Sequence, residues 1–203
     1  GRVIEYAVKM KKLPADGMLV KMLAEDRVTP GAMDEIARKL ANFHGSAETG
    51  GEIDRFGSIE VIRRNHDENF EQTAPFIDRT IGKEQYGLLR LYINDFLERK
   101  RSLLEERVSR GRIRDCHGDL HAEHICLTDG IVIYDCIEFN DRFRYSDTAA
   151  DVAFLAMDLD YRGYPDHSRA FVEAYVRHSA DGGLRELLPF YECYYAYVRG
   201  KVI

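Results

Sequence analysis

The chain has 203 residues, of which 45% are hydrophobic and 32% charged, a balance that is typical of a folded globular protein and unlike a disordered one. Its formal net charge is −6, so we expect no binding to nucleic acid, which requires a basic face. No apolar run is long enough to span a membrane, no signal-peptide pattern is present, and the four cysteines form no CxxC pair, so we expect a cytoplasmic protein without membrane contact.

The first segment with a clear pattern is residues 3–10, where alternating β-forming side chains predict a strand that ends before Pro14. The chain opens on Gly1 without a methionine and stops at Ile203 within an apolar pattern, so we interpret it as a fragment of a longer polypeptide. No repeat, low-complexity tract or linker divides residues 1–203, which we therefore expect to form a single domain.

Helical patterns dominate the first half of the chain. Asp16 is expected to cap one helix, and Thr29 followed by a proline predicts the start of another. Gly50 and Gly51 mark a loop. The last helix of this half is long and amphipathic, with leucines and aromatic residues along one side. We expect helices over residues 16–26, 30–44, 58–72, 74–79 and 83–109.

The second half begins with short apolar segments and then returns to helical patterns. Asp129 and Gly130 form a strong hairpin signal between the last two of these segments. Asp147 is expected to cap the helix that follows a polar loop. We expect strands over residues 113–116, 125–128 and 131–135, and helices over residues 147–161, 166–178 and 184–203. The sequence therefore predicts an α+β fold that is mainly α, with a small β-hairpin element.

The polar residues around this β element suggest phosphoryl transfer. Residues 116–124 read Cys-His-Gly-Asp-Leu-His-Ala-Glu-His, and Asp135 follows at the end of the next hairpin strand. In phosphoryl transfer the protein positions the acceptor and neutralises charge on the phosphates. Asp119, on the turn, suits a catalytic base, and Asp135 suits a ligand of the Mg²⁺ ion that bridges the phosphates. His117 is expected to hold the loop through hydrogen bonds to backbone carbonyls.

The roles of two further carboxylates are open, and the same histidines and aspartate allow a second interpretation of the site. Glu138 and Asp141 lie just beyond the predicted metal ligand and could serve the substrate or the metal. Alternatively, His117, Asp119, His121 and His124 could together bind zinc or iron in a metal-dependent hydrolase. The flanking sequence favours a strand and a turn, which does not match the helical HExxH motif of zinc hydrolases.

The loop at residues 117–121 resembles the catalytic loop of the aminoglycoside phosphotransferase and choline kinase family, which reads HGDLHxxN. Three further segments are similar to that family in the same order. They are the Leu-His helix end at residues 40–44, the strand end at residues 134–136 and the DPxxDLA-like helix start at residues 147–153. The resemblance implies a protein-kinase-like fold and the transfer of a phosphoryl group from ATP or GTP, with Mg²⁺, to a hydroxyl of a small molecule. That molecule would be aminoglycoside-, sugar- or amino-alcohol-like.

The same resemblance implies a role for each part of the chain. Residues 1–12 correspond to the hinge strand and residues 13–203 to the helical C-terminal lobe, so the N-terminal lobe is mostly absent. The hinge backbone of Glu5, Tyr6 and Ala7 would receive the nucleotide base. Together with the reading of the residues, this gives Asp119 and His117 as the candidate catalytic residues, Asp135 and His124 as the candidate metal residues, and Glu138 and Asp141 as the candidate substrate residues.

The sequence departs from the family motif at one position, and a further segment is similar to one branch of the family. His124 stands where the family has an asparagine, and imidazole is a poor ligand for Mg²⁺. A non-catalytic pseudokinase that serves as a binding or regulatory module is therefore the main alternative. Residues 135–141 resemble a bacterial branch in which the kinase-like domain is often fused to a P-loop ATPase domain, which would here lie beyond Ile203. We expect the tyrosines of residues 191–197 to pack in the core rather than line an acceptor pocket.

Overall fold

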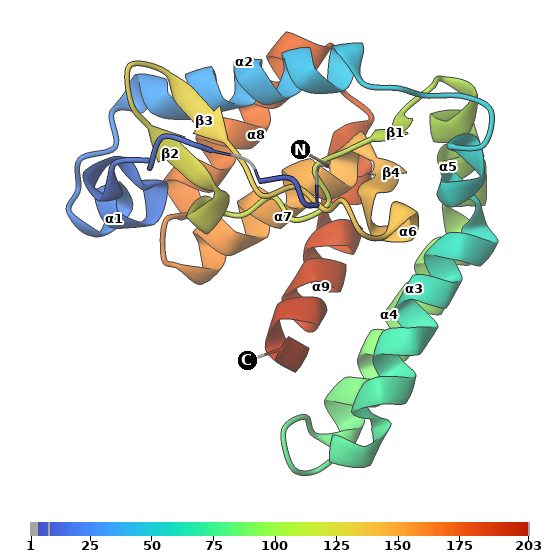
Figure 1. Ribbon diagram of the computed structural model, residues 1–203. Coiled ribbons are helices and arrows are strands. Elements are labelled where there is room, and N and C mark those ends of the chain that lie inside the picture. Colours follow the sequence, from blue (N-terminus) through green and yellow to red (C-terminus); the bar gives the residue numbers. More distant parts are fainter. Residues whose placement is uncertain (1–3, 8, 203) are drawn as a thin grey trace.

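The computed structural model describes residues 4–7 and 9–202, and this part of the chain is mainly helical with four short strands (Figure 1). The α-helices are α1 (Leu19–Ala24), α2 (Pro30–Ser46), α3 (Ile59–Thr73), α4 (Lys83–Arg99), α5 (Arg101–Ser109), α6 (Asp141–Arg144), α7 (Thr148–Tyr161), α8 (Pro165–Ser179) and α9 (Leu184–Val202). The strands are β1 (Ile113–Asp115), β2 (Ile125–Leu127), β3 (Ile131–Ile133) and β4 (Tyr145–Asp147). Four 3₁₀ turns complete the described elements: η1 (Ala15–Gly17), η2 (Asp54–Gly57), η3 (Ala74–Phe76) and η4 (Ala122–His124).

Helix α7 is the centre of the molecule, and its sequence explains why. Almost every residue of this helix is apolar or small, and residues 148–159 are all buried, so the helix has no face suited to water. Helices α8 and α9 pack against it, and α2 packs on α8 (Figure 1). Two acidic side chains in this buried stretch, Asp151 and Asp158, have hydrogen-bond partners, as buried charges require.

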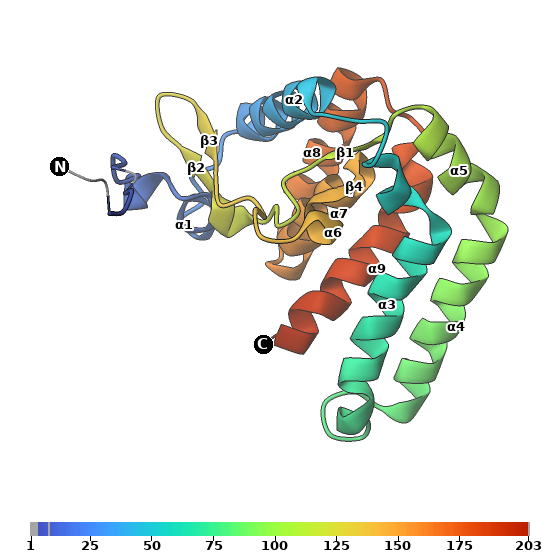
Figure 2. The same cartoon turned by 45° about the vertical axis from the view of Figure 1, so that its right-hand side comes forward.

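Helices α3 and α4 form an antiparallel pair that extends away from the rest of the fold, with α9 beside α3 (Figure 2). Ser58 caps α3 by accepting a hydrogen bond from the amide of Val61. Among the described helices, none combines the length and the apolar character that a bilayer crossing needs.

The strands form two antiparallel pairs. In the first pair β2 runs beside β3 around the predicted hairpin, with Ile125 opposite Ile133. In the second pair β1 runs beside β4, with Ile113 opposite Asp147. The sequence predicted the first pair but not β4, because β4 has only three residues and its partner lies more than thirty residues earlier in the chain.

The predicted helix over residues 83–109 is in fact two helices. Lys100 interrupts the helical backbone with φ −103° and ψ 14°, and α5 continues in a new direction. The apolar side predicted for this segment is also partly wrong, since Leu88 and Leu91 are exposed whereas Ile93 and Leu97 are buried. The amphipathic pattern does not report this change of direction, which follows from the packing of α5 against the body of the fold.

Two predictions near the N-terminus are wrong for physical reasons. The described residues 4–7 and 9–10 form no strand and are exposed, because the structure gives this described segment no neighbouring strand to pair with. Residues 3 and 8 lie outside the described residues. Asp16 caps no helix: it lies in η1, and α1 begins after Met18, which forms a β-bridge with Cys126. That tertiary contact fixes where the helix begins.

Candidate active site

The loop between β1 and β2 carries the predicted catalytic residues, and a buried carboxylate of α7 holds it in place. Asp151 accepts hydrogen bonds from the amides of His117 (2.7 Å) and Gly118 (2.8 Å). Gly118 has φ +80°, and a Cβ at this position would lie 2.6 Å from the carbonyl oxygen of Phe143. The loop therefore needs glycine at position 118. The carboxylate of Asp151 and the backbone of Phe143 together fix the path of the loop.

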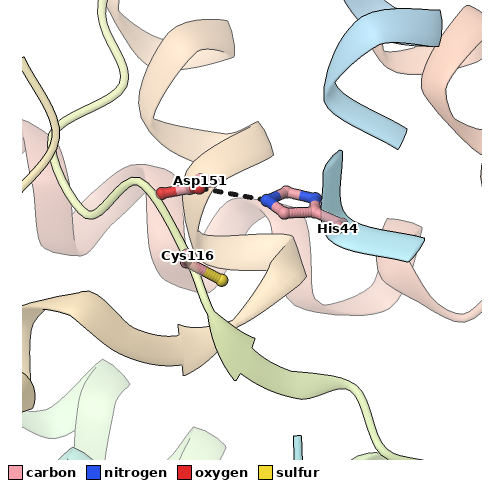
Figure 3. A group of neighbouring side chains, drawn as sticks. All are labelled: His44, Cys116 and Asp151. Atoms are coloured by element: carbon pink, nitrogen blue, oxygen red, sulfur yellow. Dashed lines mark hydrogen bonds and ion pairs between the residues drawn. The ribbon is translucent and has the colours of Figure 1, made fainter. Parts of the chain in front are cut away.

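Behind the loop, Asp151 belongs to a buried cluster with His44 and Cys116 (Figure 3). The Nε2 atom of His44 lies 3.0 Å from Asp151, and its Nδ1 atom lies 2.7 Å from the hydroxyl of Tyr175. Burial by itself would raise the pKa of Asp151, but the hydrogen bonds and charges of His44 and His117 together outweigh burial and lower the pKa below its ordinary value. Burial also raises the pKa of the Cys116 thiol.

These contacts indicate that the buried cluster braces the loop rather than holding a metal ion. Both oxygens of Asp151 already accept hydrogen bonds from N–H groups. A thiol with a raised pKa keeps its proton, whereas metal binding requires the thiolate. The Leu-His helix end that the sequence analysis singled out thus supplies His44 as the partner of Asp151.

His117 uses both ring nitrogens within the loop. Its Nε2 atom lies 2.8 Å from the carbonyl oxygen of Tyr134, so Nε2 donates the hydrogen bond. Its Nδ1 atom then accepts a bond of 3.3 Å from the amide of Asp119. This arrangement agrees with the expectation that His117 holds the loop in shape.

The side chain of Asp119 is about one-third exposed, with a relative accessibility of 34%. Its Oδ2 atom lies 3.7 Å from Nε2 of His121 and 3.6 Å from Nδ1 of His124. Burial would raise the pKa of Asp119, but His121 and His124 together lower it below its ordinary value. Asp119 is therefore ionised at neutral pH, as a proton acceptor must be.

Asp135 lies on the other side of the His124 ring. Its Oδ2 atom is 3.5 Å from Nε2 of His124, and its side chain is 73% exposed. The backbone at Asp135 is left-handed (φ +62°), a conformation that aspartate tolerates better than most residues. The structure thus brings the two predicted carboxylates, Asp119 and Asp135, to opposite edges of one imidazole.

The protons on His124 follow from its partners. Its Nδ1 atom lies 2.9 Å from the carbonyl oxygen of Asp119, and because a carbonyl only accepts, Nδ1 carries a proton. In a neutral ring, Nε2 then presents its lone pair to the Asp135 carboxylate. A cation bound between these two groups would relieve the repulsion between the lone pair and the carboxylate.

Of the two side chains that meet here, Asp135 offers a donor atom that suits Mg²⁺ and His124 offers one that does not. Asp135 offers an exposed carboxylate, and magnesium commonly takes one or two protein carboxylates and fills its remaining positions with water and phosphate oxygens. His124 offers only nitrogen, which magnesium accepts poorly. Asp119, His121 and His124 also lie within 4.8 Å of one another, as the hydrolase alternative requires, but His117 has both nitrogens bound to the backbone.

The remaining predicted site residues lie elsewhere. Glu138 and Asp141 are exposed and do not line the cavity beside Asp119. Glu5, Tyr6 and Ala7 are exposed and have no regular secondary structure. They belong to the N-terminal segment that precedes η1.

A cavity of about 260 Å³ opens beside Asp119. Its walls come from η2, α3, the loop between β1 and β2, α6, β4, α7 and α9. Tyr191, Tyr194 and Tyr195 line it while also packing into the core, so the expectation that they serve only as core residues was incomplete. The polar and charged lining residues are Asn65, His66, Asn69, Asp119, Arg142, Ser146, Asp147 and Lys201.

His66 makes the stability of the fold depend on pH. Its ring is buried between Phe190 and Tyr194, and burial lowers its pKa from 6.5 to about 3. Below pH 6.5 His66 therefore binds a proton in the unfolded chain but not in the folded chain. The free energy of unfolding falls as the pH falls. Between pH 7 and pH 5 we expect this group to remove about 2 kcal/mol. Urea unfolding at both pH values should show a smaller loss in His66→Gln, and an equal loss would contradict the assignment.

Arg107 is the structural residue that the sequence analysis missed. Its guanidinium is buried on α5, where it donates hydrogen bonds to both oxygens of Asp147 and both oxygens of Asp181. Asp147 also caps α7 by accepting from the amide of Ala149 (2.8 Å), which confirms the predicted cap. Arg107 stands in a helix rich in charged residues, so the sequence alone does not distinguish it from its exposed neighbours.

Comparison with known proteins gives the same family that the loop residues suggested. Uncharacterized proteins from two strains of Mycobacterium tuberculosis and from Mycobacterium bovis are 34% identical to this chain over 199 residues. The match covers 98% of this chain and 40% of each relative, so the chain spans less than half the length of the curated proteins it matches. No solved structure matches the chain. The model of the phosphotransferase enzyme family matches residues 7–190, and the chain therefore belongs to this family, the aminoglycoside phosphotransferase and choline kinase-like group.

Proposed function

We propose that this chain transfers the γ-phosphoryl group of ATP or GTP, with Mg²⁺, to a hydroxyl of a small molecule. The observation that carries the proposal is the position of Asp119, an ionised and partly exposed carboxylate at the wall of a cavity, with Asp135 across the His124 ring. Family membership supports a phosphotransferase of the kinase type. The cavity beside Asp119 offers a place for the acceptor.

In the proposed reaction Asp119 orients the acceptor hydroxyl and takes its proton. The acceptor oxygen forms a bond to the γ-phosphorus, the bond from that phosphorus to the β–γ bridging oxygen breaks, and the nucleoside diphosphate leaves with the electron pair. Asp135 would hold Mg²⁺, with His124 at its side, and the ion would supply positive charge against the phosphate oxygens. His117 and Asp151 keep the loop, and with it the Asp119 carboxylate, in position.

The proposal extends to parts of the chain that do not touch this cavity. Residues 13–203 would form the C-terminal lobe of a kinase-like fold, and the backbone of Glu5, Tyr6 and Ala7 would receive the nucleotide base. Glu138 and Asp141, both exposed, would contact substrate only if the nucleotide or acceptor extends beyond the cavity. A fused P-loop ATPase domain would lie beyond Ile203.

A binding experiment followed by a transfer assay tests this function on the full-length protein. We expect ATP or GTP with Mg²⁺ to raise the melting temperature, and nucleotide without metal to raise it less. Asp135→Asn should remove most of the effect of Mg²⁺, whereas Asp129→Asn, which changes an exposed hairpin-turn carboxylate, should not. Loss of γ-phosphate from the nucleotide should then depend on an added hydroxylated acceptor. Absence of nucleotide binding and of transfer would refute the proposal.

A second candidate, a non-catalytic binding module, rests on His124. The ring fills the position where the family has a metal-binding asparagine, and its Nδ1 atom is occupied by the carbonyl oxygen of Asp119. A module of this kind would bind nucleotide without turning it over. Nucleotide binding with no transfer to any acceptor would favour this candidate over the enzyme.

A further inference from the structure

The cavity beside Asp119 contains unused hydrogen-bonding capacity. In the part of the chain that the structure describes, only five buried side-chain atoms lack a hydrogen-bond partner, and three of them belong to residues that line this cavity. These three atoms are Asn65 Oδ1, Asn69 Nδ2 and Arg142 Nη1. Buried polar groups are nearly always paired, so a cluster of unpaired ones around a cavity indicates that a bound polar molecule supplies the partners.

The three residues come from two elements, α3 and α6, that both line the cavity. Asn65 and Asn69 are four residues apart, so they share one face of α3. Arg142 lies on α6, and its other terminal nitrogen, Nη2, donates a 2.6 Å hydrogen bond to Glu68 of α3. This bond fixes the guanidinium against α3, beside the two asparagines. The unpaired set consists of one acceptor and two donors, and one of the donors carries a full positive charge.

The charges on the cavity wall favour an anionic ligand. Lys201 of α9, which lies beside α3 (Figure 2), also lines the cavity, and its Nζ atom is bonded to the amide oxygens of Asn69 and Gln72. These partners are neutral, and the Glu68 carboxylate that acts on Lys201 electrostatically is already ion-paired with Arg142 and Arg64. Apart from Asp119, the carboxylate in the lining is Asp147, which is buried and bonded to Arg107. An acidic wall of the kind that a polycationic acceptor needs is therefore missing from the described lining.

The volume of the cavity and its aromatic lining restrict the class of ligand further. A volume of about 260 Å³ lies below the usual range for drug-sized ligands, which excludes a molecule of several sugar rings held entirely inside. Phe143, Tyr191, Tyr194 and Tyr195 supply flat apolar surfaces that suit the carbon faces of a sugar-like skeleton.

We propose that the acceptor is a small hydroxylated anion, whose carboxylate or phosphate binds Arg142 and Asn69 while one of its hydroxyls reaches Asp119. The assignment rests on the proposed function for the role of Asp119. It replaces the cationic aminoglycoside or amino alcohol by a molecule of opposite charge. Arg142 and Asn69 then determine specificity, because they recognise a part of the acceptor that does not react.

Calorimetry on the full-length protein tests this proposal without requiring any phosphoryl transfer. Four probes of similar size separate the classes of acceptor: gluconate for carboxylates, glucose 6-phosphate for phosphates, glucose for neutral polyols and glucosamine for cations. We expect one of the two anions to bind at least about tenfold more tightly than glucose, the factor that a hydrogen bond to a charged group provides. Which anion binds identifies carboxylate or phosphate as the recognised group.

Substitution of Arg142 provides the second arm. We expect Arg142→Gln to weaken binding of the anion about 10- to 100-fold and to leave glucose unaffected, since a charge-assisted hydrogen bond is lost. Arg142→Lys should retain part of the affinity. The matched control is Arg64→Gln, because Arg64 also binds Glu68 (2.9 Å) but does not line the cavity. If Arg142→Gln fails to fold, Lys201→Gln serves as the second variant and should weaken the anion in the same direction.

The outcomes separate this proposal from the proposed function. Tighter binding of glucosamine than of either anion, equal effects of Arg142→Gln and Arg64→Gln, or no binding of any probe would overturn the anionic acceptor. Each of those results leaves nucleotide binding and acceptor-dependent loss of γ-phosphate as separate measurements of the proposed function. If the anion binds but no acceptor-dependent loss of γ-phosphate occurs, the cavity is a binding site without transfer.

Discussion

Asp119→Asn is expected to lower kcat by about 100-fold or more in the full-length protein, the usual loss when a general base is removed. The asparagine side chain has almost the same shape, but its amide cannot take a proton from the acceptor hydroxyl. Asp119 is ionised at neutral pH because His121 and His124 hold its pKa below the ordinary value despite burial. The measurement is the rate of phosphoryl transfer to the acceptor under saturating nucleotide.

Nucleotide affinity provides the control for this variant. Asp119 and Asp135 lie at opposite edges of the His124 ring, and in the proposed reaction Asp135 holds the Mg²⁺ of the nucleotide, so Asp119→Asn should leave the nucleotide Kd largely unchanged. Asp129→Asn, on the exposed turn between β2 and β3, should alter neither quantity. Turnover equal to that of the unmodified protein would remove Asp119 from the role of base.

Arg107→Met is expected to destabilise the fold by about 3 to 5 kcal/mol, the usual cost of removing one partner from a buried ion pair. The substitution leaves Asp147 buried without its counter-ion and leaves Asp181 only the more distant Arg112, whose Nε atom lies 3.7 Å away. Burial opposes the charge of Arg107, but the two carboxylates outweigh it and raise the pKa of the guanidinium. Methionine fills a similar volume, so the loss should come from the charge and not from a cavity.

Chemical unfolding with urea measures this loss, and a surface variant calibrates it. Arg101→Met, in the same helix, removes an exposed arginine whose Nη1 atom lies 3.8 Å from Glu105. We expect that substitution to cost less than about 1 kcal/mol, as exposed ion pairs do. Similar losses in the two variants would show that the buried network adds nothing specific to stability.

Local signals in the sequence were sufficient for much of the fold. The helix starts at Thr29 and Ser58 and the Asp147 cap depend on residues within one turn of each other, and the structure confirms where these helices begin. The hairpin around Asp129 and Gly130 is equally local. The motif residues Asp119 and Asp135 lie against one imidazole, that of His124. Their roles as base and metal ligand stay predictions.

Features that depend on distant contacts could not be read in the same way. The pairing of β4 with β1, the break at Lys100 and the two carboxylate partners of Arg107 each require knowledge of the tertiary arrangement. Residues 4–7 and 9–10 have a strand-like pattern, but a strand forms only where another strand accepts its hydrogen bonds. The cavity was missed for the same reason, since α3, α6 and α9 contribute side chains that are far apart in the sequence.

Helix α7 connects two regions that a mutational survey would treat as unrelated. Asp147 at its start anchors the guanidinium of α5, and Asp151, one turn later, carries the loop that presents Asp119. A substitution in α5 is therefore expected to disturb the first turn of the helix whose Asp151 holds the loop of Asp119. If a substitution near residue 107 lowers turnover, the cause would then be a shift of the first turn of α7 that displaces the loop of Asp119. Asp119 itself would be unchanged.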